Sequence, residues 1–402
     1  MAQRRPVVVI VQRLIPQYRV PFFEALKSEL AARQIELSLV HSNSVFEDDL
    51  RRDRANVAWA DHVGARSIRI GGRVLIWQHV PRWVWQADLV VVEQASQLLL
   101  NYALLTARPL GGPMVGLWGH GTSRHRDASR ASEAVKRILS RKPDWWFAYT
   151  DGVAALVREF GFPTDRITSV RNAIDTRRLS DEVANVTEPE LEALRGDLGL
   201  EGKRVGLFVG ALVPEKHLDF VVTAGEAVRA ELPDFELVIA GAGPLEGWVE
   251  QQAARHPWLS FAGQRFGPDL AALMRLSTFL FVPAWVGLVI TDSFAAGKPL
   301  LASASAEHPP EIDYLRHREN GLLIEDDGDP LRHAAAVVAA IEDQELLDRM
   351  VAGCRTDAQL YSAENMARRF ADGISSALSA GPRRRRGRSP ARWKTGTGAG
   401  AS

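Results

Sequence analysis

Short apolar runs alternate with amphipathic segments along most of the chain. Residues 7–11 form a continuous β-branched run, which is typical of a buried strand in a parallel sheet. Residues 21–33 follow it and place Phe22, Leu26 and Leu30 at helical spacing. The same alternation predicts further strands at 35–40, 67–70, 89–93, 114–118, 145–149 and 167–170, and helices at 98–108, 131–140 and 151–160. Strands that alternate with helices of this length predict a doubly wound parallel sheet.

A second alternating series begins at residue 204. It predicts strands at 205–209, 235–240, 259–262, 278–282, 300–302 and 321–324, and helices at 218–231, 245–256, 269–276, 288–296, 331–352 and 363–378. The polar residues between the two series carry repeated acids and Pro189, with one short amphipathic piece at 191–198. We therefore expect an α/β protein of five parts. These are a Rossmann-like domain at 1–172, an interdomain connection at 173–203, a second Rossmann-like domain at 204–360, a final helix at 361–380 and a basic tail at 381–402.

The formal charge of zero hides an asymmetry between the body and the tail. The tail holds seven bases and no acid, so 42 bases stand against 49 acids in the rest of the chain. An acidic body argues against a nucleic-acid-binding domain, and the composition of the tail predicts disorder. Seven of the 11 tryptophans lie in the first domain, where they either form an aromatic wall for a sugar or lipid or pack in the core.

Several classes of protein are excluded. One cysteine, Cys354, allows no disulfide framework. No signal peptide and no apolar run long enough to span a membrane is visible, which predicts a cytoplasmic protein. Contact with the inner face of a membrane stays open, since the basic residues of 131–142 are suited either to anionic lipid or to solvent. No G-x-G-x-x-G follows the first strand, which disfavours a classical dinucleotide fold. Arg13 and Arg19 lie in the loop after the first strand. Three alternatives stay open for their side chains, which are contact with a phosphate, contact with an acceptor and exposure to solvent.

The segment 281–303 carries the clearest candidate site. A strand breaks at Pro283, a turn of small residues includes Gly287, and a helix follows. Ligands of open parallel sheets bind outside the carboxyl ends of the strands, where the amide groups of a helix N-terminus attract phosphate. Asp292 lies about one turn inside this helix, within reach of a ribose or sugar hydroxyl.

Two earlier loops have a similar position between a strand and a helix. Residues 208–220 include Gly210 and place Lys216 at the mouth of the loop, where its ammonium can meet phosphates. Residues 241–245 read Gly-Ala-Gly-Pro-Leu, and glycines there allow a ligand close to the backbone.

Together these stretches resemble the donor-sugar motifs of the family 4 glycosyltransferases, which have the GT-B fold and retain the anomeric configuration. Gly287-Leu288, Asp292, Ala296-Gly297 and Pro299 fall in step with P-S-x-x-E-G-F-G-L-x-x-L-E-A-x-A-x-G-x-P-V-V. Lys216 matches the lysine of F-x-G-R-L-x-x-x-K-G, and residues 241–245 match G-x-G-P-L. The resemblance implies two Rossmann-like domains facing across a cleft, a C-terminal helix that crosses back to the first domain, and no bound metal.

The resemblance also implies roles for particular residues. A UDP- or GDP-sugar is the expected donor, and a glycan, a glycolipid or another small hydroxyl compound the expected acceptor, in a setting such as envelope-polysaccharide assembly. His120 is expected near the donor sugar and Asp292 at the ribose. The diphosphate and nucleotide are expected to contact Gly210, Lys216, Gly241, Gly243, Pro244, Gly287, Leu288 and Val289.

Two departures from the family pattern leave alternatives open. Ala211 stands at the position of the pattern's arginine and Ala284 at that of its first glutamate. Either Arg265 or Lys298 supplies the missing charge, or the donor binds weakly. The alternatives are a non-catalytic nucleotide-sugar-binding or assembly subunit and a sugar-nucleotide epimerase of the same fold.

Three further positions of the family pattern have open or modest roles. Glu311 is either a donor contact or a carboxylate at a helix start. Asn320-Gly321 is expected to form a turn with positive φ, and residues 172–175 a hinge between the domains.

Overall fold

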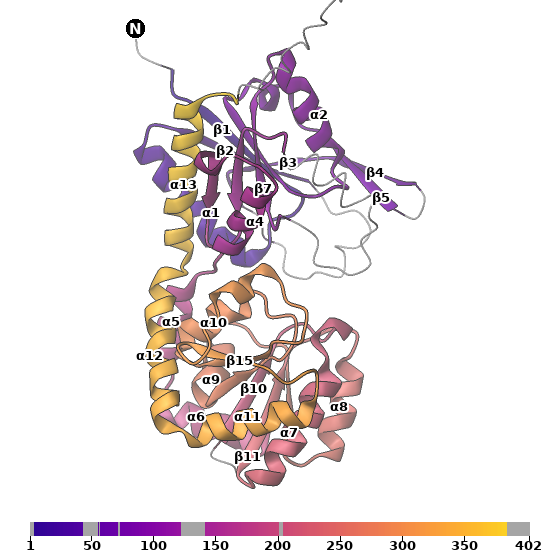
Figure 1. Cartoon of the computed structure of the whole chain (residues 1–402), viewed down its shortest axis with the longest axis vertical. Coiled ribbons are helices and arrows are strands. Elements are labelled where there is room, and N and C mark those ends of the chain that lie inside the picture. The colour runs from indigo at the N-terminus through magenta and orange to yellow at the C-terminus, as the bar shows by residue number, and fades with distance from the viewer. Residues whose placement is uncertain are drawn as a thin grey trace, which may run out of the picture.

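The protein is built from two parallel sheets, each flanked by helices (Figure 1). Two long helices near the end of the chain follow one another along one side of the molecule, one beside each sheet. The computed structural model describes residues 4–42, 55, 57–70, 73–121, 141–200 and 204–383. The helix expected at 131–140 and residues 384–402 of the expected tail lie outside the described residues.

The first sheet has seven strands in the order β3-β2-β1-β6-β7-β8-β9, all parallel. Its strands are β1 (Val7–Gln12), β2 (Glu36–Ser42), β3 (Ala60–Val63), β6 (Leu89–Glu93), β7 (Met114–Gly119), β8 (Trp145–Ala148) and β9 (Ile167–Ser169). The helices described around it are α1 (Val20–Ala32), α2 (Leu99–Ala107) and α4 (Asp151–Glu159). Trp118, Trp145 and Trp146 are buried in the core, so these three tryptophans form no exposed aromatic wall.

The strand expected at 67–70 does not join this sheet. It is β4 (Ala65–Ile70), which pairs antiparallel with β5 (Arg73–Gln78) in a separate hairpin. A strand inside a parallel sheet is buried on both faces. Ile68 and Ile70 are instead more than half exposed, as expected for a strand that lies outside the sheet.

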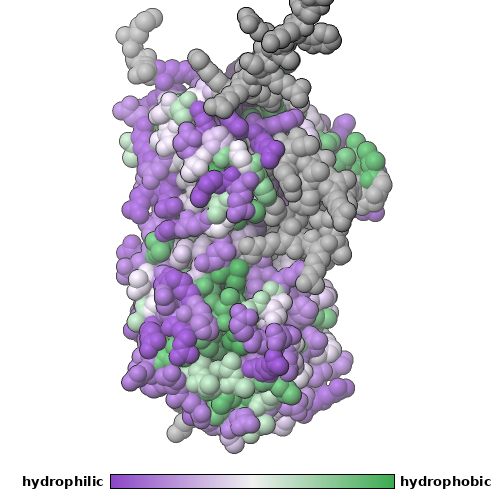
Figure 2. All heavy atoms as spheres, in the orientation of Figure 1, coloured by the Kyte–Doolittle hydropathy of each residue, from purple (hydrophilic) through white to green (hydrophobic). Residues whose placement is uncertain are grey.

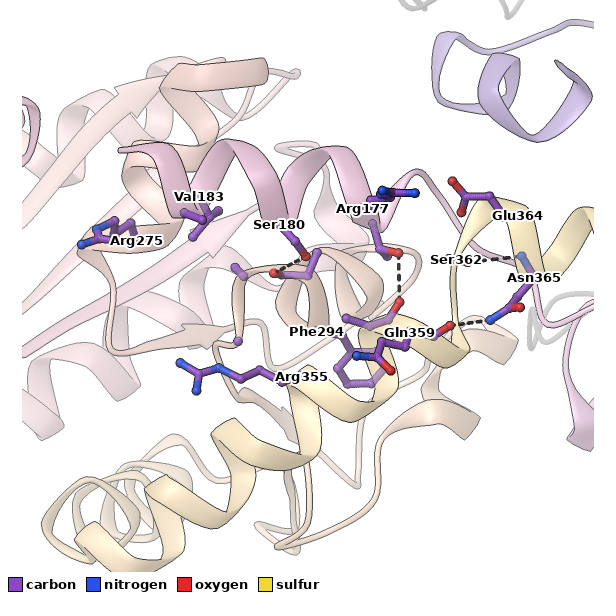
Figure 3. Close-up of a pocket in the computed structure, with 16 residues that line it drawn as sticks. Arg177, Ser180, Val183, Arg275, Phe294, Arg355, Gln359, Ser362, Glu364 and Asn365 are labelled. Atoms are coloured by element: carbon purple, nitrogen blue, oxygen red, sulfur yellow. Dashed lines mark hydrogen bonds between the residues drawn. The ribbon is translucent and has the colours of Figure 1, made fainter. Parts of the chain in front are cut away.

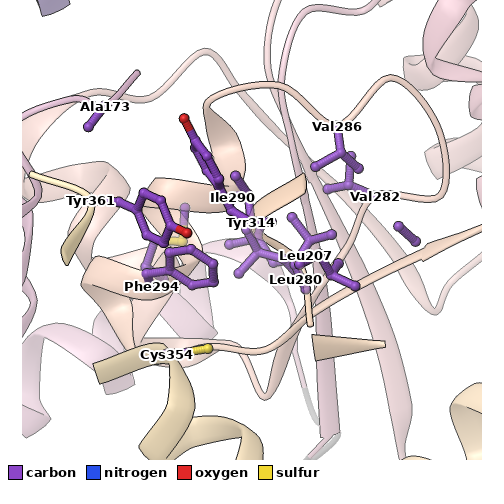
Figure 4. Close-up of a cluster of buried hydrophobic side chains, with 14 of the residues drawn as sticks. Ala173, Leu207, Leu280, Val282, Val286, Ile290, Phe294, Tyr314, Cys354 and Tyr361 are labelled. Carbon is purple, nitrogen blue, oxygen red and sulfur yellow. The ribbon is translucent and has the colours of Figure 1, made fainter. Parts of the chain in front are cut away.

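The second sheet has six parallel strands in the order β12-β11-β10-β13-β14-β15. They are β10 (Arg204–Val209), β11 (Phe235–Ala240), β12 (Leu259–Gly263), β13 (Phe279–Phe281), β14 (Leu300–Ser303) and β15 (Gly321–Ile324). The helices connecting them include α7 (Leu218–Glu231), α8 (Glu246–Arg255), α9 (Gly267–Leu276) and α10 (Val289–Ala296). Side chains from these elements, among them Leu207, Leu280 and Ile290, form a buried cluster that Tyr314 and Tyr361 close on one side (Figure 4).

The segment expected to be an open connection is largely helical. It contains α5 (Thr176–Asn185) and α6 (Glu188–Leu198), and the hydroxyl of Ser180 donates to the carbonyl of Ala295 at 2.8 Å. The acids and Pro189 that suggested a linker belong to a helix start, because Thr187 and Glu190 form a capping box with Pro189 in the first turn. The segment therefore packs against the second domain.

Three helices close the chain: α11 (Pro330–Glu342), α12 (Gln344–Leu360) and α13 (Ala363–Ala380). A single helix over 331–352 was the wrong prediction, because Asp343 ends α11 and caps α12 through Leu346 N–H. Helix α13 does cross back onto the first domain, where the ring of Phe370 stacks on Phe147 with centroids 4.2 Å apart. Figure 2 shows a mainly hydrophilic outer surface along this edge of the molecule.

The carboxyl edges of the two sheets face each other. The 3-10 helix η7 (Pro310–Tyr314) follows β14, and Thr150 follows β8 of the first sheet. Thr150 Oγ1 donates to Asp313 Oδ2 at 2.6 Å, and the hydroxyl of Tyr314 reaches the carbonyl of Tyr149 at 3.2 Å. Residues that follow strands of different domains thus meet directly, which is the arrangement that the family resemblance implied.

The chain after α13 begins attached to the first domain. Arg383 N–H donates to Asp144 Oδ1 at 2.7 Å, and Arg166 donates to the carbonyl of Gly381 at 2.9 Å. The disorder predicted from residue 381 onward was therefore wrong for residues 381–383. No helix in the described ranges is long and apolar enough to cross a membrane.

Candidate functional site

The candidate site lies at the carboxyl ends of β10 and β13, where the strand order of the second sheet reverses. From β10 the chain proceeds outward through β11 and β12, and it then returns to the other side of β10 as β13. The loops that leave β10 and β13 therefore diverge and open a crevice between them, the usual place for a ligand in an open α/β sheet. Gly210 follows β10 and Gly287 lies in the loop after β13.

Lys216 joins these two loops. It ends the 3-10 helix η6 (Pro214–Lys216), and its Nζ donates to the carbonyl of Trp285 at 2.7 Å. A Cβ atom at Gly210 would lie 3.4 Å from this Nζ, so the lysine lies against the start of its own loop. The side chain is buried, and burial lowers the pKa of the ammonium to about 8. Only one of the three ammonium hydrogens has a protein acceptor in the described chain, which leaves the others for a ligand.

The glycines at 241 and 243 are required by the packing of two loops. A Cβ atom at Gly241 would collide with the carbonyl oxygen of Gly210, and one at Gly243 would lie 2.5 Å from that of Leu212. The loops are joined by backbone hydrogen bonds, including Leu212 N–H to the carbonyl of Ala242 at 2.9 Å. Close approach of a ligand, the expected reason for these glycines, is therefore not needed to explain them. Pro244 follows on the exposed side, next to the start of α8.

The start of α10 presents backbone donors. Within the described part of the chain the amide groups of Gly287, Leu288 and Val289 have no hydrogen-bond acceptor. Such amides, at the positive end of a helix, are a ready site for an anion. They lie directly after Trp285, whose carbonyl binds Lys216, so the amides and the ammonium share one neighbourhood.

Asp292 lies in the first turn of α10. Its side chain is partly buried, and burial raises the pKa of its carboxyl group to about 7. No ion pair or hydrogen bond to this carboxylate occurs among the described residues. A carboxylate that is desolvated without a partner is costly for the free protein, and this is typical of a group that meets a ligand.

His308 is a positioning residue that the motif analysis did not single out. It is buried, its Nδ1 accepts from Val286 N–H at 3.2 Å, and its Nε2 donates to the carbonyl of Ser303 at 2.8 Å. The ring thus ties the loop before Gly287 to the end of β14. A histidine five residues after the strand gives no sequence signal for this role, since the role depends on the fold of two separate segments.

His308→Leu is expected to weaken donor binding roughly 3- to 10-fold, because two hydrogen bonds of about 0.5–1.5 kcal/mol net are lost and Val286 N–H is left unpaired. Calorimetry with the donor and hydrogen exchange of the Val286 amide measure the effect. His256→Leu, at the far end of α8, serves as the matched control. Unchanged affinity together with faster exchange would remove His308 from the set of positioning residues.

His120 lies just past β7, at the edge of the first sheet that faces the second domain. Its side chain is exposed, and its ring lies 4.2 Å from that of Tyr149. Tyr149 accepts the hydroxyl of Tyr314 through its carbonyl, so His120 is one residue away from the contact between the domains. Its role toward the donor sugar stays a prediction.

The structure separates several other candidates from this site. Lys298 precedes β14 and so lies at the opposite edge of the sheet, where its Nζ donates to the carbonyl of Arg275 at 3.1 Å. It therefore cannot supply the charge missing at Ala211. Arg265 follows β12 at the outer edge of the sheet and donates to the carbonyl of Ala262. Two strands separate it from the loop after β13.

The structure bears on three further expectations. Arg19 is not solvated but buried, with its guanidinium 5.0 Å from the centre of the Trp118 ring. Glu311 lies in the first turn of η7, which is one of the two roles considered for it, and it also accepts from Asn172 at 2.6 Å across the domain junction. Asn320 has no positive φ; its side chain is buried and donates to Asp357 at 2.7 Å.

No group of three or more histidine, cysteine, aspartate or glutamate side chains within the described ranges is placed to hold a metal ion. The groups that the described residues present at the site include one ammonium, three amides and one carboxylate.

Comparison with known proteins agrees with this geometry. Residues 203–343 match the family model described as glycosyl transferases group 1. This segment is a glycosyl transferases group 1 domain. It contains the loops after β10, β11 and β13, and with them Lys216, Gly243 and Asp292.

Curated relatives extend the likeness beyond that domain. A glycogen synthase of Mycobacterium tuberculosis is 27% identical over 265 residues, which are 61% of this chain and 59% of the relative. A GDP-mannose-dependent alpha-mannosyltransferase of the same organism is 29% identical over 249 residues, 59% of this chain and 60% of the relative. The chain thus spans about 60% of the length of these relatives.

Solved structures show the fold. Anabaena Alr3699/HepE in complex with UDP has a TM-score of 0.66 to this chain at 15% identity, and the match covers 92% of this chain and all of the other. The architecture is the GT-B fold, with two Rossmann-like domains.

Proposed function

We propose that the protein is a glycosyltransferase that moves a sugar from a nucleotide-diphosphate sugar to a hydroxyl acceptor with retention of anomeric configuration. The observation that carries the proposal is the junction of Lys216 with the loop before α10. It places an ammonium beside three amides with no acceptor, at the switch point of the sheet inside a glycosyl transferases group 1 domain. This set of groups suits a diphosphate better than any other common ligand.

The chemical task of these groups is to stabilise charge on the leaving group. In the transfer, the bond between the anomeric carbon and the diphosphate oxygen breaks and a bond to the acceptor oxygen forms. The proton of the acceptor hydroxyl passes to the departing diphosphate or to water. The diphosphate gains negative charge as it departs. The ammonium of Lys216 and the amides of Gly287, Leu288 and Val289 stand where this charge develops.

The remaining residues bind the ribose and the sugar of the donor. Asp292 accepts from a hydroxyl of the ribose, and His120 faces the sugar from the first domain, which also presents the acceptor. The donor is a UDP- or GDP-sugar; the structural neighbour with UDP and the relative that uses GDP-mannose support one base each. The acceptor is a glycan, a glycolipid or another small hydroxyl compound.

A screen of nucleotide sugars by thermal unfolding tests the proposal before the acceptor is known. A donor that binds only the folded protein raises the midpoint of unfolding, and the rise increases with the ratio of the donor concentration to its Kd. We expect one UDP- or GDP-sugar to stabilise the protein and the others to act less. Absence of stabilisation by every UDP- and GDP-sugar would contradict the proposal.

A non-catalytic nucleotide-sugar-binding subunit is the second candidate, because Ala211 and Ala284 replace two donor-site side chains of the family pattern. Neither alanine has a polar side-chain atom to offer a ligand, and Ala284 is also buried. Hydrolysis and transfer assays with the stabilising donor separate the two functions. Turnover supports the transferase, and binding without turnover supports the subunit.

A further inference from the structure

A second hollow of ≈ 750 Å³ lies in the second domain, away from the candidate donor site (Figure 3). It is bounded by α5, by the C-terminal end of α10, by α12 and by the first turn of α13. The donor site uses the N-terminal end of α10. Eight residues of helix separate the two ends by about 12 Å, so the hollow and the donor site are different places.

The hollow has an excess of positive charge. Three arginines line it, Arg177, Arg275 and Arg355, against one acid, Glu364. Neither Arg177 nor Arg355 has a carboxylate partner in the described part of the chain. Arg275 pairs with Glu188 at 3.2 Å, but that carboxylate is 75% exposed, and such pairs are weak.

A fourth cation lies behind the lining. Burial, together with the nearby guanidinium groups of Arg275 and Arg355, lowers the pKa of the Lys298 ammonium to about 8. Arg355 lies against the end of α10, since a Cβ atom at Gly297 would be 3.4 Å from its Nε. Lys298, Arg275 and Arg355 are thus close enough to repel one another, and a bound anion would relieve this repulsion.

The hollow offers few acceptors, although the C-terminal ends of α10 and α12 border it. Carbonyl groups at both of these ends already accept from side chains of the facing helices. Ser180 donates to Ala295, Thr176 donates to Ala358 at 3.0 Å, and Asn365 donates to Gln359. The polar groups left for a ligand are mainly guanidinium donors, which suit phosphate oxygens.

We propose that this hollow binds a small phosphorylated molecule through Arg177, Arg275 and Arg355. The hollow lies where the chain passes between the two domains, so a ligand bound there affects how the domains are placed. Helix α5 begins where the chain enters the second domain, and α13 begins where the chain returns to the first. A ligand that bridges α5, α12 and α13 therefore favours one relative placement of the domains, and so changes donor affinity.

Calorimetry with inorganic phosphate on the full chain, at ionic strength matched with chloride, tests the binding. The informative variant is Arg177→Gln/Arg355→Gln, which removes two exposed side chains. We expect it to fold normally, as thermal unfolding in chloride will show, and to lose at least about 10-fold in phosphate affinity. Arg349→Gln, exposed on the same helix as Arg355 but outside the hollow, is expected to bind phosphate like the wild type.

Lys216→Ala shows whether phosphate binds at the donor site instead. Equal affinity in this variant and in the wild type supports the hollow. Failure of the wild type to bind phosphate, unchanged binding in the double variant, or loss confined to Lys216→Ala would overturn the proposal. Donor affinity measured with and without phosphate is expected to differ in the wild type and not in the double variant. Equal values in the wild type would overturn the link to the domains.

Discussion

Replacing Lys216 with alanine is expected to weaken the binding of the nucleotide-diphosphate sugar roughly 10- to 100-fold. The estimate follows from the loss of one charge-assisted contact of about 1.5–3 kcal/mol. The loss falls on the diphosphate, so we expect UDP or GDP alone to be affected as strongly as the sugar donor. Calorimetry with both ligands measures this.

The pH dependence of the same binding identifies the ammonium. Lys216 has a pKa of about 8 in the folded protein, below its ordinary value of 10.5. A diphosphate favours the charged form, so donor binding takes up protons above pH 8 and affinity falls as the pH rises further. Lys216→Ala is expected to lose this dependence.

The stability of the free protein shows the opposite trend. Between about pH 8 and 10.5 the unfolded chain binds more protons at Lys216 than the folded one, so this residue's contribution to stability rises with pH.

The matched control is Lys27→Ala, on α1 of the first domain, where the ammonium lies 4.3 Å from the centre of the Trp59 ring. Its donor affinity is expected to equal that of the wild type. Equal affinity in Lys216→Ala and in the wild type would show that the ammonium only anchors the Trp285 carbonyl, and the proposed diphosphate site would then be wrong.

The sequence predicted the two sheets well because strands in parallel sheets are continuous apolar runs. Helix α7 and strand β11 have the predicted bounds, and β1 and β10 differ by one residue at an end. The hairpin was missed, although the sequence contains a signal for it. Residues 65–70 alternate with Arg66 and Arg69 instead of forming a continuous apolar run, and a Gly-Gly pair separates them from residues 73–78, which is typical of a β-hairpin.

The connection between the domains failed for a different reason. Prolines and acids mark both linkers and helix starts, and the choice depends on whether a side chain caps the backbone. Thr187 and Glu190 do so here, and Asp175 caps α5 through Arg178 N–H. The residues of this segment are compatible with either an open linker or two helices. Packing against α9 and α10 makes the helices stable.

For the site, the sequence identified loops rather than interactions. Strand-to-helix turns with glycine predicted which loops meet, because their place at the ends of parallel strands follows from topology. Lys216 and Trp285, which share a hydrogen bond, are 69 positions apart in the sequence. His308 and Val286 are 22 positions apart, and Arg19 is about 100 positions from Trp118, against whose ring it is buried. Such contacts are set by the packing of the whole domain and leave no periodic signal. The misplacement of Lys298 has the same origin, since neighbours in a motif can lie at opposite edges of a sheet.

Asp292→Asn is expected to make the free protein more stable and the donor weaker. The carboxyl pKa of Asp292 is about 7 in the folded protein and 3.8 ordinarily, so between these values the folded state holds a proton that the unfolded state has lost. The free energy of unfolding that this residue contributes therefore falls as the pH rises from about 4 to 7. Asparagine cannot ionise, and the variant is expected to keep its stability across that range, as denaturant titrations at several pH values will measure.

Donor binding has the reverse dependence. An ionised carboxylate accepts from a ribose hydroxyl, so donor affinity in the wild type is expected to rise as the pH increases through about 7, with release of a proton on binding. In Asp292→Asn the affinity is lower and independent of pH in this range. Asp181→Asn, at an exposed position on α5, controls for the general loss of a negative charge. Asp292→Asn could also gain stability and still bind the donor like the wild type at pH 8. In that case the ionised carboxylate only destabilises the folded protein and binds no ligand, and another residue must hold the ribose.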